Sequence, residues 1–177
     1  MKILYKELLL DDLHPSLLTN FNRYQETNMV LYKDNDKYRL KRDYFVEEWD
    51  DVKKREIVQS LQQCVQIGGI VIGAFHSEHL IGFANVEGEF FGTEKQYLEL
   101  PYIHVSNEYR NFGIGKQLFQ LCCEKAEQKG AKKLYIAAHP SEETQHFYRS
   151  VGCIYAEEIN DEILAREPLD IQLERVL

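Results

Sequence analysis

The most constraining feature of this sequence is a β-strand that runs into a helix through a loop and two glycines. We predict a strand over residues 96–105, a loop over 106–112 and a helix over 113–129. Gly113 and Gly115 open that helix. The first amides of a helix have no intrahelical partner, and they point along the positive end of its dipole. The segment therefore predicts an anion cradle of a size suited to a pyrophosphate.

Arg110 lies in the loop before these glycines and adds a positive charge beside the helix start. Because Gly113 and Gly115 have no side chains, a phosphate can approach the backbone there. The segment lacks the G-K-[ST] of a Walker loop and the three glycines of a dinucleotide-binding fingerprint. A turn glycine before an ordinary helix start explains the same residues, so a second motif has to decide between the two interpretations.

Composition limits the classes of function. The chain has 177 residues, 44% of them hydrophobic, and we expect residues 1–177 to form a single domain. A formal net charge of -8 argues against a nucleic-acid partner and favours cationic partners such as amines. No stretch approaches the roughly 20 apolar residues of a membrane span, so we expect no membrane association. The four cysteines lack metal-ligand spacing, which predicts no metal site and free thiols in the cytoplasm.

The rest of the chain alternates strands and helices without repeats or linkers. We predict strands over residues 2–8, 70–75, 80–86, 134–138, 153–156 and 169–173, a hairpin with strands 29–33 and 38–41, and helices over 12–21, about 51–68 and 142–151. Pro101 has no N–H, so it belongs at a bulge, an unpaired position or an edge of its strand. This order predicts an α+β fold with a mixed sheet.

A second motif follows 31 residues after Arg110. Ser141 is a good N-cap for a helix, Phe147 and Tyr148 follow on that helix, and Gly152 ends it. With these residues in order, residues 70–155 resemble the GNAT superfamily of N-acetyltransferases. The first motif matches the acetyl-CoA signature [RQ]-x-x-G-x-[GA] in full. The second resembles N-x-x-A-x-x-F-Y-x-x-x-G-F, with Ser for Asn, Thr for Ala and Cys for Phe at residues 141, 144 and 153.

The resemblance implies the acyl-CoA N-acyltransferase fold, which is a mostly antiparallel central sheet flanked by helices and splayed at the cofactor site. It also implies direct transfer of an acetyl group from acetyl-CoA to a primary amine in a ternary complex. The cofactor would contact the backbone of Ile103, His104 and Val105, the cradle residues Arg110, Asn111, Phe112, Gly113, Ile114, Gly115 and Lys116, and Ser141 and Tyr148 on the later helix.

Tyr148 is our candidate for the general acid. A phenol of ordinary pKa, about 10, is protonated at pH 7 and can give a proton to the departing thiolate. Tyrosine at this place commonly has that role in the superfamily that the chain resembles. The alternative is an aromatic core residue, for which the adjacent Phe147 is the more natural choice.

Glu99 is our first candidate for the general base, since a glutamate occupies the matching position in the histone-acetylating branch of the superfamily. A solvated glutamate on the polar face of a strand is the alternative interpretation. His104 is the second candidate, because imidazole titrates near neutrality. Its neighbours Ile103 and Val105 indicate that the His104 side chain lies on the other face of its strand.

The acceptor is less defined than the cofactor. Acidic residues gather in the first third of the chain near several aromatic residues, which would suit a cationic amine or merely a solvated surface: Asp34, Asp36, Glu47, Glu48, Asp50 and Asp51 beside Tyr32, Tyr38, Tyr44, Phe45 and Trp49. We expect a small-molecule acceptor rather than a protein, and a homodimer is compatible with this interpretation. The alternative function is a catalytically silent acyl-CoA-binding sensor or interaction module.

Overall fold

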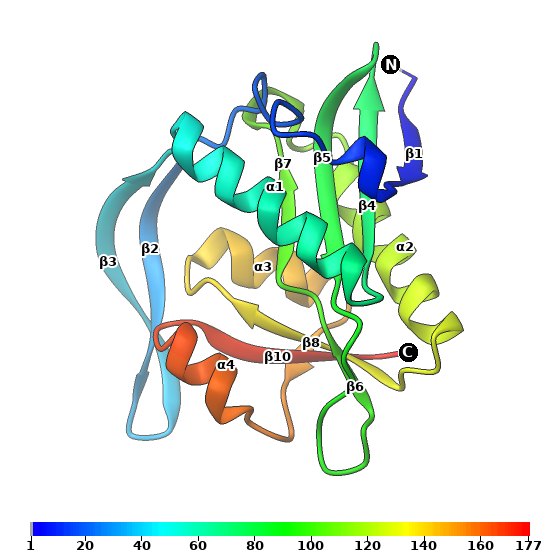
Figure 1. The fold of residues 1–177 in the computed structure, drawn as a ribbon. Coiled ribbons are helices and arrows are strands. Elements are labelled where there is room, and N and C mark those ends of the chain that lie inside the picture. The colour runs from blue at the N-terminus through cyan, green and yellow to red at the C-terminus, as the bar shows by residue number, and fades with distance from the viewer. Residues whose placement is uncertain (1) are drawn as a thin grey trace.

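The computed structural model describes residues 2–177 and forms a mixed α+β fold (Figure 1). In chain order the elements are β1 (Leu4–Glu7), the 3-10 turn η1 (Leu10–Asp12), β2 (Gln25–Asp34), β3 (Lys37–Glu47), α1 (Asp51–Gln66), β4 (Ile70–His76), β5 (His79–Val86), β6 (Tyr97–Glu99), β7 (Tyr102–Val105), the 3-10 turn η2 (Asn107–Tyr109), α2 (Ile114–Gln128), β8 (Lys133–Ala138), α3 (Glu142–Ser150), β9 (Ile154–Tyr155), α4 (Asp161–Arg166) and β10 (Ile171–Val176).

The central strands divide into two four-stranded sheets. The first has the order β1-β4-β5-β7, with every pair antiparallel. The second has the order β6-β8-β10-β9, in which β6 and β8 are parallel. The predicted strand over residues 96–105 is therefore two short strands, β6 and β7, in different sheets. Pro101 lies between them, as expected for a residue without an N–H to contribute to a ladder.

This switch leaves β7 and β8 without mutual pairing in the described part of the chain. We call the divergence of these two strands the splay. The splayed, mostly antiparallel α+β architecture confirms the predicted fold class.

Helices cover both faces of the first sheet (Figure 1). On one face α2 packs against β4, β5 and β7, and its side chains Ile114, Leu118 and Cys122 are buried in the larger core. On the other face α1 buries Ile57, Val58 and Leu61 against β4 and β5. The helix expected over about residues 51–68 is α1, and Asp50 is its N-cap, because its Oδ1 accepts a hydrogen bond from the Lys53 N–H at 2.7 Å.

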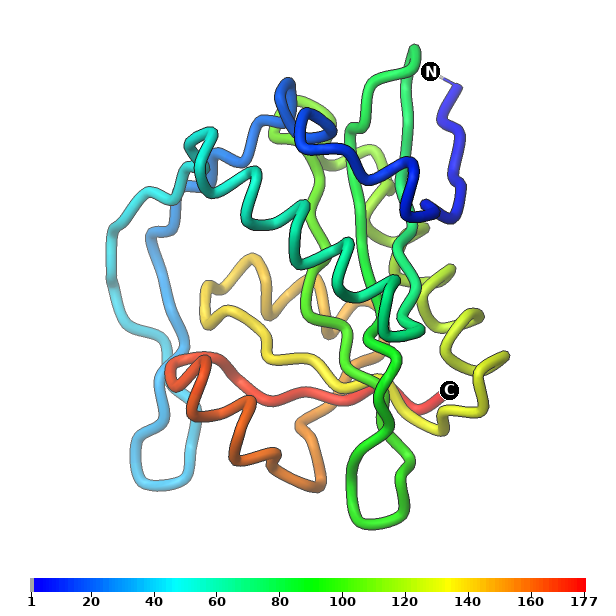
Figure 2. The backbone as a smooth tube through the Cα atoms, viewed as in Figure 1, coloured from blue at the N-terminus to red at the C-terminus, as the bar shows by residue number. Residues whose placement is uncertain are grey.

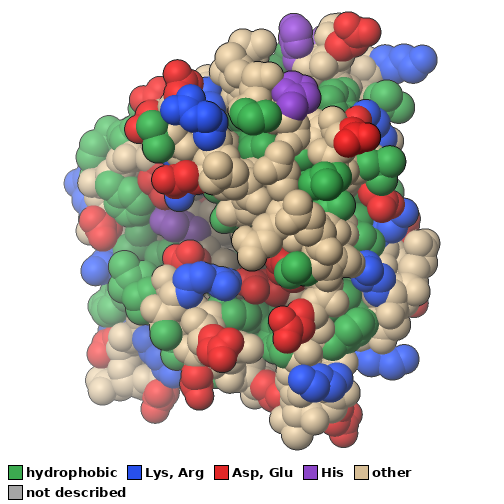
Figure 3. All heavy atoms as spheres, in the orientation of Figure 1, with side chains coloured by type: hydrophobic (Ala, Val, Ile, Leu, Met, Phe, Trp, Pro, Cys, Tyr) green, Lys and Arg blue, Asp and Glu red, His purple; other side chains and the backbone are tan. Residues whose placement is uncertain are grey.

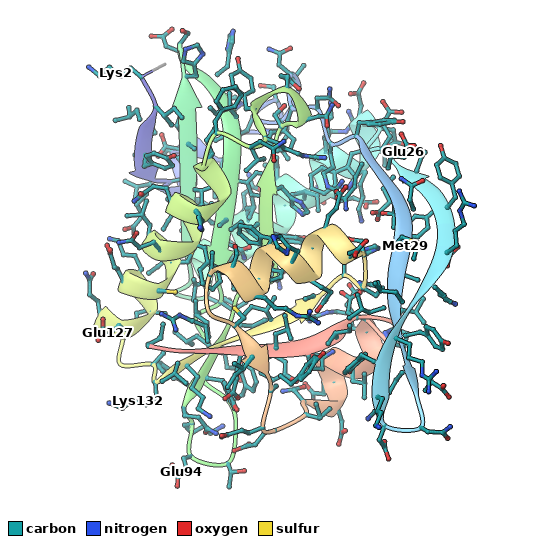
Figure 4. The ribbon with its side chains drawn as sticks, turned by 180° about the vertical axis from the view of Figure 1, so that it is seen from behind. Lys2, Glu26, Met29, Glu94, Glu127 and Lys132 are labelled. Atoms are coloured by element: carbon teal, nitrogen blue, oxygen red, sulfur yellow. The ribbon has the colours of Figure 1, made fainter. Side chains whose placement is uncertain are left out.

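A long hairpin of β2 and β3 stands beside the two sheets (Figure 2). The view from behind shows Glu26 and Met29 on the strand that passes the start of α3 (Figure 4). There the Leu31 N–H donates to the Pro140 carbonyl at 2.8 Å. The predicted hairpin is confirmed and is longer than its apolar pattern indicated.

One expected helix is absent from the described residues, and one helix of the structure was not expected. The helix expected over residues 12–21 is replaced by η1 and successive tight turns, because these turns place Leu13, Leu18 and Phe21 in the core under α1. Helix α4 was not expected at all. Its signal was the N-cap Asn160, whose Oδ1 accepts from the Ile163 N–H at 3.0 Å.

Helix α3 depends on the cap at Ser141. The Oγ of this buried serine accepts a hydrogen bond from the Thr144 N–H at 3.3 Å. Ser141→Ala should lower the free energy of unfolding by about 1 kcal/mol, because it leaves a helix N–H without a partner. Ser141→Thr keeps a capping hydroxyl and should retain most of that stability. Urea unfolding followed by circular dichroism measures both, and an unchanged midpoint for Ser141→Ala would contradict the cap.

Candidate active site

The splay exposes one backbone edge of β7. The Ser106 N–H donates to the Ile81 carbonyl of the neighbouring chain segment at 2.8 Å. Because hydrogen-bonded residues alternate along an antiparallel pair, His104 also directs its backbone groups toward β5. Ile103 and Val105 therefore direct theirs toward the splay. Three residues were expected to contact the cofactor through their backbone. Two of them, Ile103 and Val105, have their backbone groups on the open side of β7.

The cradle predicted from the sequence forms at the start of α2, next to the splay. Gly113 is the N-cap, with φ +79°, and it offers no side chain to the helix amides. A Cβ at Gly113 would have no heavy atom within 4 Å, so the space in front of it is open. The Arg110 Nε donates to the Val105 carbonyl at 3.1 Å, which ties the loop to the end of β7. The start of α2 thus has free amides in front of open space, and a cation is held in the loop that leads to it.

Gly115 has a different role from Gly113. A Cβ at Gly115 would lie 3.3 Å from Phe147 Cε2, so the glycine allows α2 and α3 to approach each other. The other cradle residues differ in exposure: Ile114 is buried in the core, whereas Asn111, Phe112 and Lys116 are exposed. Ile114 therefore contributes its backbone at most, and Asn111 holds its positive φ of 65° in the loop.

Tyr148 lies on α3 and belongs to the larger core, where its ring packs on Phe119 and Phe147. Its side chain is 6% exposed, and its hydroxyl has no hydrogen-bond partner among residues 2–177. Burial raises the pKa of Tyr148, and the nearby Cys153 and Asp170 act in the same direction. Phe147, expected to be the core residue of the two, is only half-buried and packs on Gly115. The phenol is thus the more enclosed aromatic group, and it stays protonated at pH 7.

A cavity of about 510 Å³ opens on the face of the molecule that carries α1. Its wall comes from the end of α1, the segments around β6, and α4 with the chain that follows it. Figure 3 shows this face hollowed below α1, with acidic side chains around the hollow. The cavity reaches Pro101 and Tyr102 on one side of the splay and Ala137 on the other.

Carboxylates dominate the charge of the cavity. Its lining includes six of them, Glu87, Glu89, Glu99, Glu162, Glu167 and Asp170, and one cation, Arg166. Burial raises the pKa of Glu87, as it does for Glu99. Acidic side chains outnumber the single cation in the lining, which favours a positively charged occupant.

Glu99 is buried, not solvated, with 9% of its surface exposed. Its Oε1 pairs with the Arg166 guanidinium of α4. Burial raises the pKa of Glu99, while the charge and the hydrogen bond of Arg166 lower it. The carboxylate is at the cavity, as the general-base hypothesis requires, but one of its oxygens is already occupied.

Asp170 lies at the start of β10 and lines the same cavity. Its carboxylate accepts no hydrogen bond from residues 2–177. Burial, followed by the charges of Glu167 and Glu47, raises the pKa of Asp170 from its usual 3.8 to about 7. Sequence reasoning missed this residue, and the local sequence offered no signal for it.

His104 lies on the opposite face of β7 from the core packed under α2, as its neighbours indicated. Its ring packs on Phe83 and Trp49, and its Nδ1 accepts a hydrogen bond from the Arg23 Nε at 3.2 Å. Burial and the nearby Arg23 and Arg110 hold the pKa of His104 well below 6.5. The imidazole is neutral at pH 7 with one nitrogen engaged, and it does not line the cavity.

The acidic cluster of the first third does not form the cavity. Asp34 pairs with Arg39 at 3.1 Å near the hairpin tip, and Asp50 caps α1. Only Glu47 of this cluster comes near the splay, where its Oε2 lies 3.8 Å from His139 Nε2 at the end of β8. The cavity carboxylates come instead from the segments around β6 and from the last third of the chain.

Residues 2–177 contain no group of three or more His, Cys, Asp or Glu side chains arranged to hold a metal ion. None of the helices described here combines the length and apolar character needed to cross a membrane. Cys64, Cys122 and Cys153 are buried free thiols, and Cys123 is partly buried.

The arrangement defines a protein of the acyl-CoA N-acyltransferase fold, with a splayed mixed sheet between a glycine-opened helix and a cavity. A sequence model of the acetyltransferase (GNAT) family matches residues 35–153, which is more than half of the chain. The chain therefore belongs to the GNAT acetyltransferase family, and the resemblance found in its two motifs is confirmed.

Solved structures agree on the fold across the whole chain. A Bacillus anthracis protein assigned as a streptothricin acetyltransferase, in complex with acetyl coenzyme A, superposes with a TM-score of 0.71 at 16% identity, covering 100% of this chain and 99% of that one. Nourseothricin acetyltransferase superposes with a TM-score of 0.67 at 17% sequence identity, covering 98% of this chain and 96% of that one. The PaiA N-acetyltransferase of Thermoplasma acidophilum, in complex with coenzyme A, superposes with a TM-score of 0.60 at 17% sequence identity, covering 100% of both chains. No curated protein sequence matches this chain significantly.

Asp170 predicts a pH-dependent cost to stability. Between about pH 4 and pH 7 the unfolded chain ionises this carboxyl while the fold keeps it protonated, so stability falls as pH rises through that range. Above about pH 7 the fold carries the full cost of the buried charge. At that pH Asp170→Asn should have a free energy of unfolding about 2–4 kcal/mol higher than the wild type. This range already allows for screening of the charge by water in the open cavity.

Urea unfolding at three pH values, about 4, 6 and 8, measures this difference. The advantage of Asp170→Asn should grow from the first pH to the last. An advantage of the same size at all three would contradict the raised pKa of Asp170.

Proposed function

We propose that this protein is an acetyl-CoA-dependent N-acetyltransferase that transfers an acetyl group to the primary amine of a small cationic molecule. One observation carries the proposal: along the splay, β7 runs from Tyr102, which lines an acidic cavity, to Val105, whose carbonyl is bound by Arg110 of the anion cradle. A thioester in the splay would meet an amine arriving through the cavity. The proposal treats residues 1–177 as one catalytic domain acting in the cytoplasm, where the buried free cysteines would stay reduced.

Family membership and the local geometry support acetyl-CoA as co-substrate. The pyrophosphate would bind the free amides at the start of α2 beside Arg110. The pantetheine would form strand-like hydrogen bonds with Ile103 and Val105, whose backbone groups face the splay. The structural relatives from Bacillus anthracis and Thermoplasma acidophilum are complexes with acetyl coenzyme A and coenzyme A, which agrees with this assignment.

The cofactor assignment predicts weaker binding after two substitutions. Gly113→Val fills the open space before the helix, and Arg110→Ala removes the adjacent charge. Each should raise the Kd for acetyl-CoA at least about tenfold, and the effect of Arg110→Ala should shrink at high salt. Arg39→Ala removes a cation from the exposed hairpin and is the matched control. Calorimetry on folded variants measures Kd, and wild-type affinity in both would contradict the cradle.

The acceptor assignment rests on charge and enclosure. Six carboxylates and one arginine line the cavity, so an ammonium group is attracted to it and an anionic acceptor is repelled. A volume of about 510 Å³ lies within the usual range for small-molecule sites, which favours a small acceptor over a folded protein surface.

The chemistry would run by direct attack. The amine nitrogen, once neutral, attacks the thioester carbonyl carbon, and the C–S bond breaks as the C–N bond forms. The Tyr148 hydroxyl stays protonated at pH 7, because burial raises its pKa, and it would give its proton to the departing sulfur. The proton that leaves the ammonium would pass to a carboxylate of the cavity, for which Glu99 and Asp170 are the two candidates beside the splay.

Tyr148→Phe removes the proton donor and keeps the ring in its packing. We expect kcat to fall about 10²–10⁴-fold while the Kd for acetyl-CoA stays near the wild-type value. Tyr155→Phe, at an exposed tyrosine of β9, is the control and should leave kcat unchanged. Steady-state kinetics from thiol release decides the matter, and a Tyr148→Phe enzyme with wild-type kcat would assign Tyr148 to the core alone.

The second candidate function is a catalytically silent acyl-CoA-binding module. The presence of the candidate acid Tyr148 and of the candidate base Glu99 favours the enzyme, since a silent module is expected to have lost the acid or the base. Incubation with acetyl-CoA and a panel of mono- and diamines separates the two. Release of free thiol with any amine supports the enzyme, and tight acetyl-CoA binding without release supports the silent module.

A further inference from the structure

We propose that Asp170, rather than Glu99, is the general base that takes the proton from the acceptor ammonium. This inference rests on the proposed function. It concerns a residue that neither sequence motif includes, at the junction of α4 and β10.

The position of Asp170 meets the geometric requirement for a base. Ile171, the next residue, pairs with Ala138 at the end of β8, which fixes Asp170 beside that strand end. Asp170 lines the cavity together with Pro101 and Ala137, the residues that reach the two sides of the splay. It also acts on the ionisation of Tyr148, so the candidate acid and the candidate base share one neighbourhood.

Hydrogen bonding distinguishes Glu99 from Asp170 as candidate bases. Glu99 Oε1 pairs with the Arg166 guanidinium, which occupies that oxygen and partly offsets the burial that raises the pKa of Glu99. The Asp170 carboxylate has no such partner among residues 2–177, so both of its oxygens are free to accept a proton. We therefore assign Glu99 and Arg166 to shaping and charging the cavity wall.

The groups around Asp170 favour its protonated form. Glu167 follows α4, Glu47 ends β3, and both charges add to the effect of burial in raising the pKa of Asp170 to about 7. Tyr148 on α3 is uncharged at pH 7, and His139 after β8 has a pKa lowered by burial, so it is mostly neutral. Arg166 of α4 is occupied by Glu99. A base with this pKa is partly ionised at neutral pH and holds the proton that it accepts.

The proton balance is complete with these residues. Asp170 takes one proton from the bound ammonium, which frees the nitrogen lone pair for attack. The collapsing intermediate expels the thiolate, which takes the proton of Tyr148, and the phenolate then takes the second proton from the nitrogen. Asp170 releases its proton to the water of the cavity, so the net reaction yields an amide, a free thiol and one proton.

The test is the pH profile of kcat/KM with 1,4-diaminobutane, or with the best substrate of the amine panel. The wild type should show an acidic limb with an apparent pKa near 7, because the ionised base must meet the ammonium form. Asp170→Asn should lower kcat/KM at pH 7.5 about 10²–10³-fold, and its activity should rise with pH up to the amine's own pKa. With an acceptor amine that is already neutral at pH 7, the same substitution should lower kcat/KM far less.

Two further variants separate a base from a structural residue. Glu167→Gln removes a negative charge that raises the pKa of Asp170, so it should move the acidic limb to lower pH. Glu99→Gln should keep the limb in place, whatever its effect on KM. Loss of the limb in Glu99→Gln, or an unchanged limb in Asp170→Asn, would overturn the assignment.

Calorimetry on Asp170→Asn should show wild-type affinity for acetyl-CoA, and a lost affinity would instead indicate a structural role. If no amine is acetylated by the wild type, the proposed function itself fails and this inference falls with it. If amines are acetylated and the Asp170→Asn profile matches the wild type, only the assignment of Asp170 fails.

Discussion

The site depends on the absence of hydrogen-bonded pairing between the described strands β7 and β8, which leaves a backbone edge open. Pro101 separates β6 from β7, and these strands join different sheets, so β7 and β8 diverge. Backbone groups along such an edge are costly unless a partner satisfies them. Ile103 and Val105 carry these groups at the splay, and the Arg110 side chain satisfies one of them, the Val105 carbonyl. A ligand with its own amide groups could form hydrogen bonds with the remaining backbone groups of Ile103 and Val105. The open edge of β7 is therefore a binding position for such a ligand.

Features decided by near neighbours in sequence could be predicted. The caps at Asp50 and Ser141, the break at Pro101 and the glycine-opened helix each depend on a few adjacent residues. The helix expected over residues 12–21 failed because burial of apolar side chains under α1 outweighed local preference. The family, and with it the fold, followed from two motifs that a single sequence displays.

The acceptor side could not be predicted, because distant segments form it. Glu99 meets Arg166 across 67 residues of sequence, and no periodicity or spacing relates the two. Asp170 gains its character from burial, from the nearby Glu167 and from Glu47 at the distant end of β3, and neither the burial nor the approach of Glu47 can be read from the local sequence. Such a group lowers the stability of the folded state at neutral pH, and sites that need a basic carboxylate commonly carry that cost. Sequence reasoning placed the acidic surface in the first third of the chain, where most of those residues serve as caps and surface pairs.

The two motifs of the sequence meet in one contact, which explains why they occur together. Gly113 has open space before it, whereas a Cβ on Gly115 would lie 3.3 Å from Phe147 Cε2, so the Phe147 ring of α3 would have to shift slightly. The first glycine therefore keeps the helix start open, and the second sets the distance between α2 and α3. Tyr148 follows Phe147 on α3, so that distance also fixes where the phenol stands relative to the splay. A larger residue at 115 would therefore press on the Phe147 ring next to the candidate acid as well as on the cradle to which Gly115 belongs. This contact links the acetyl-CoA signature to the helix that carries Tyr148.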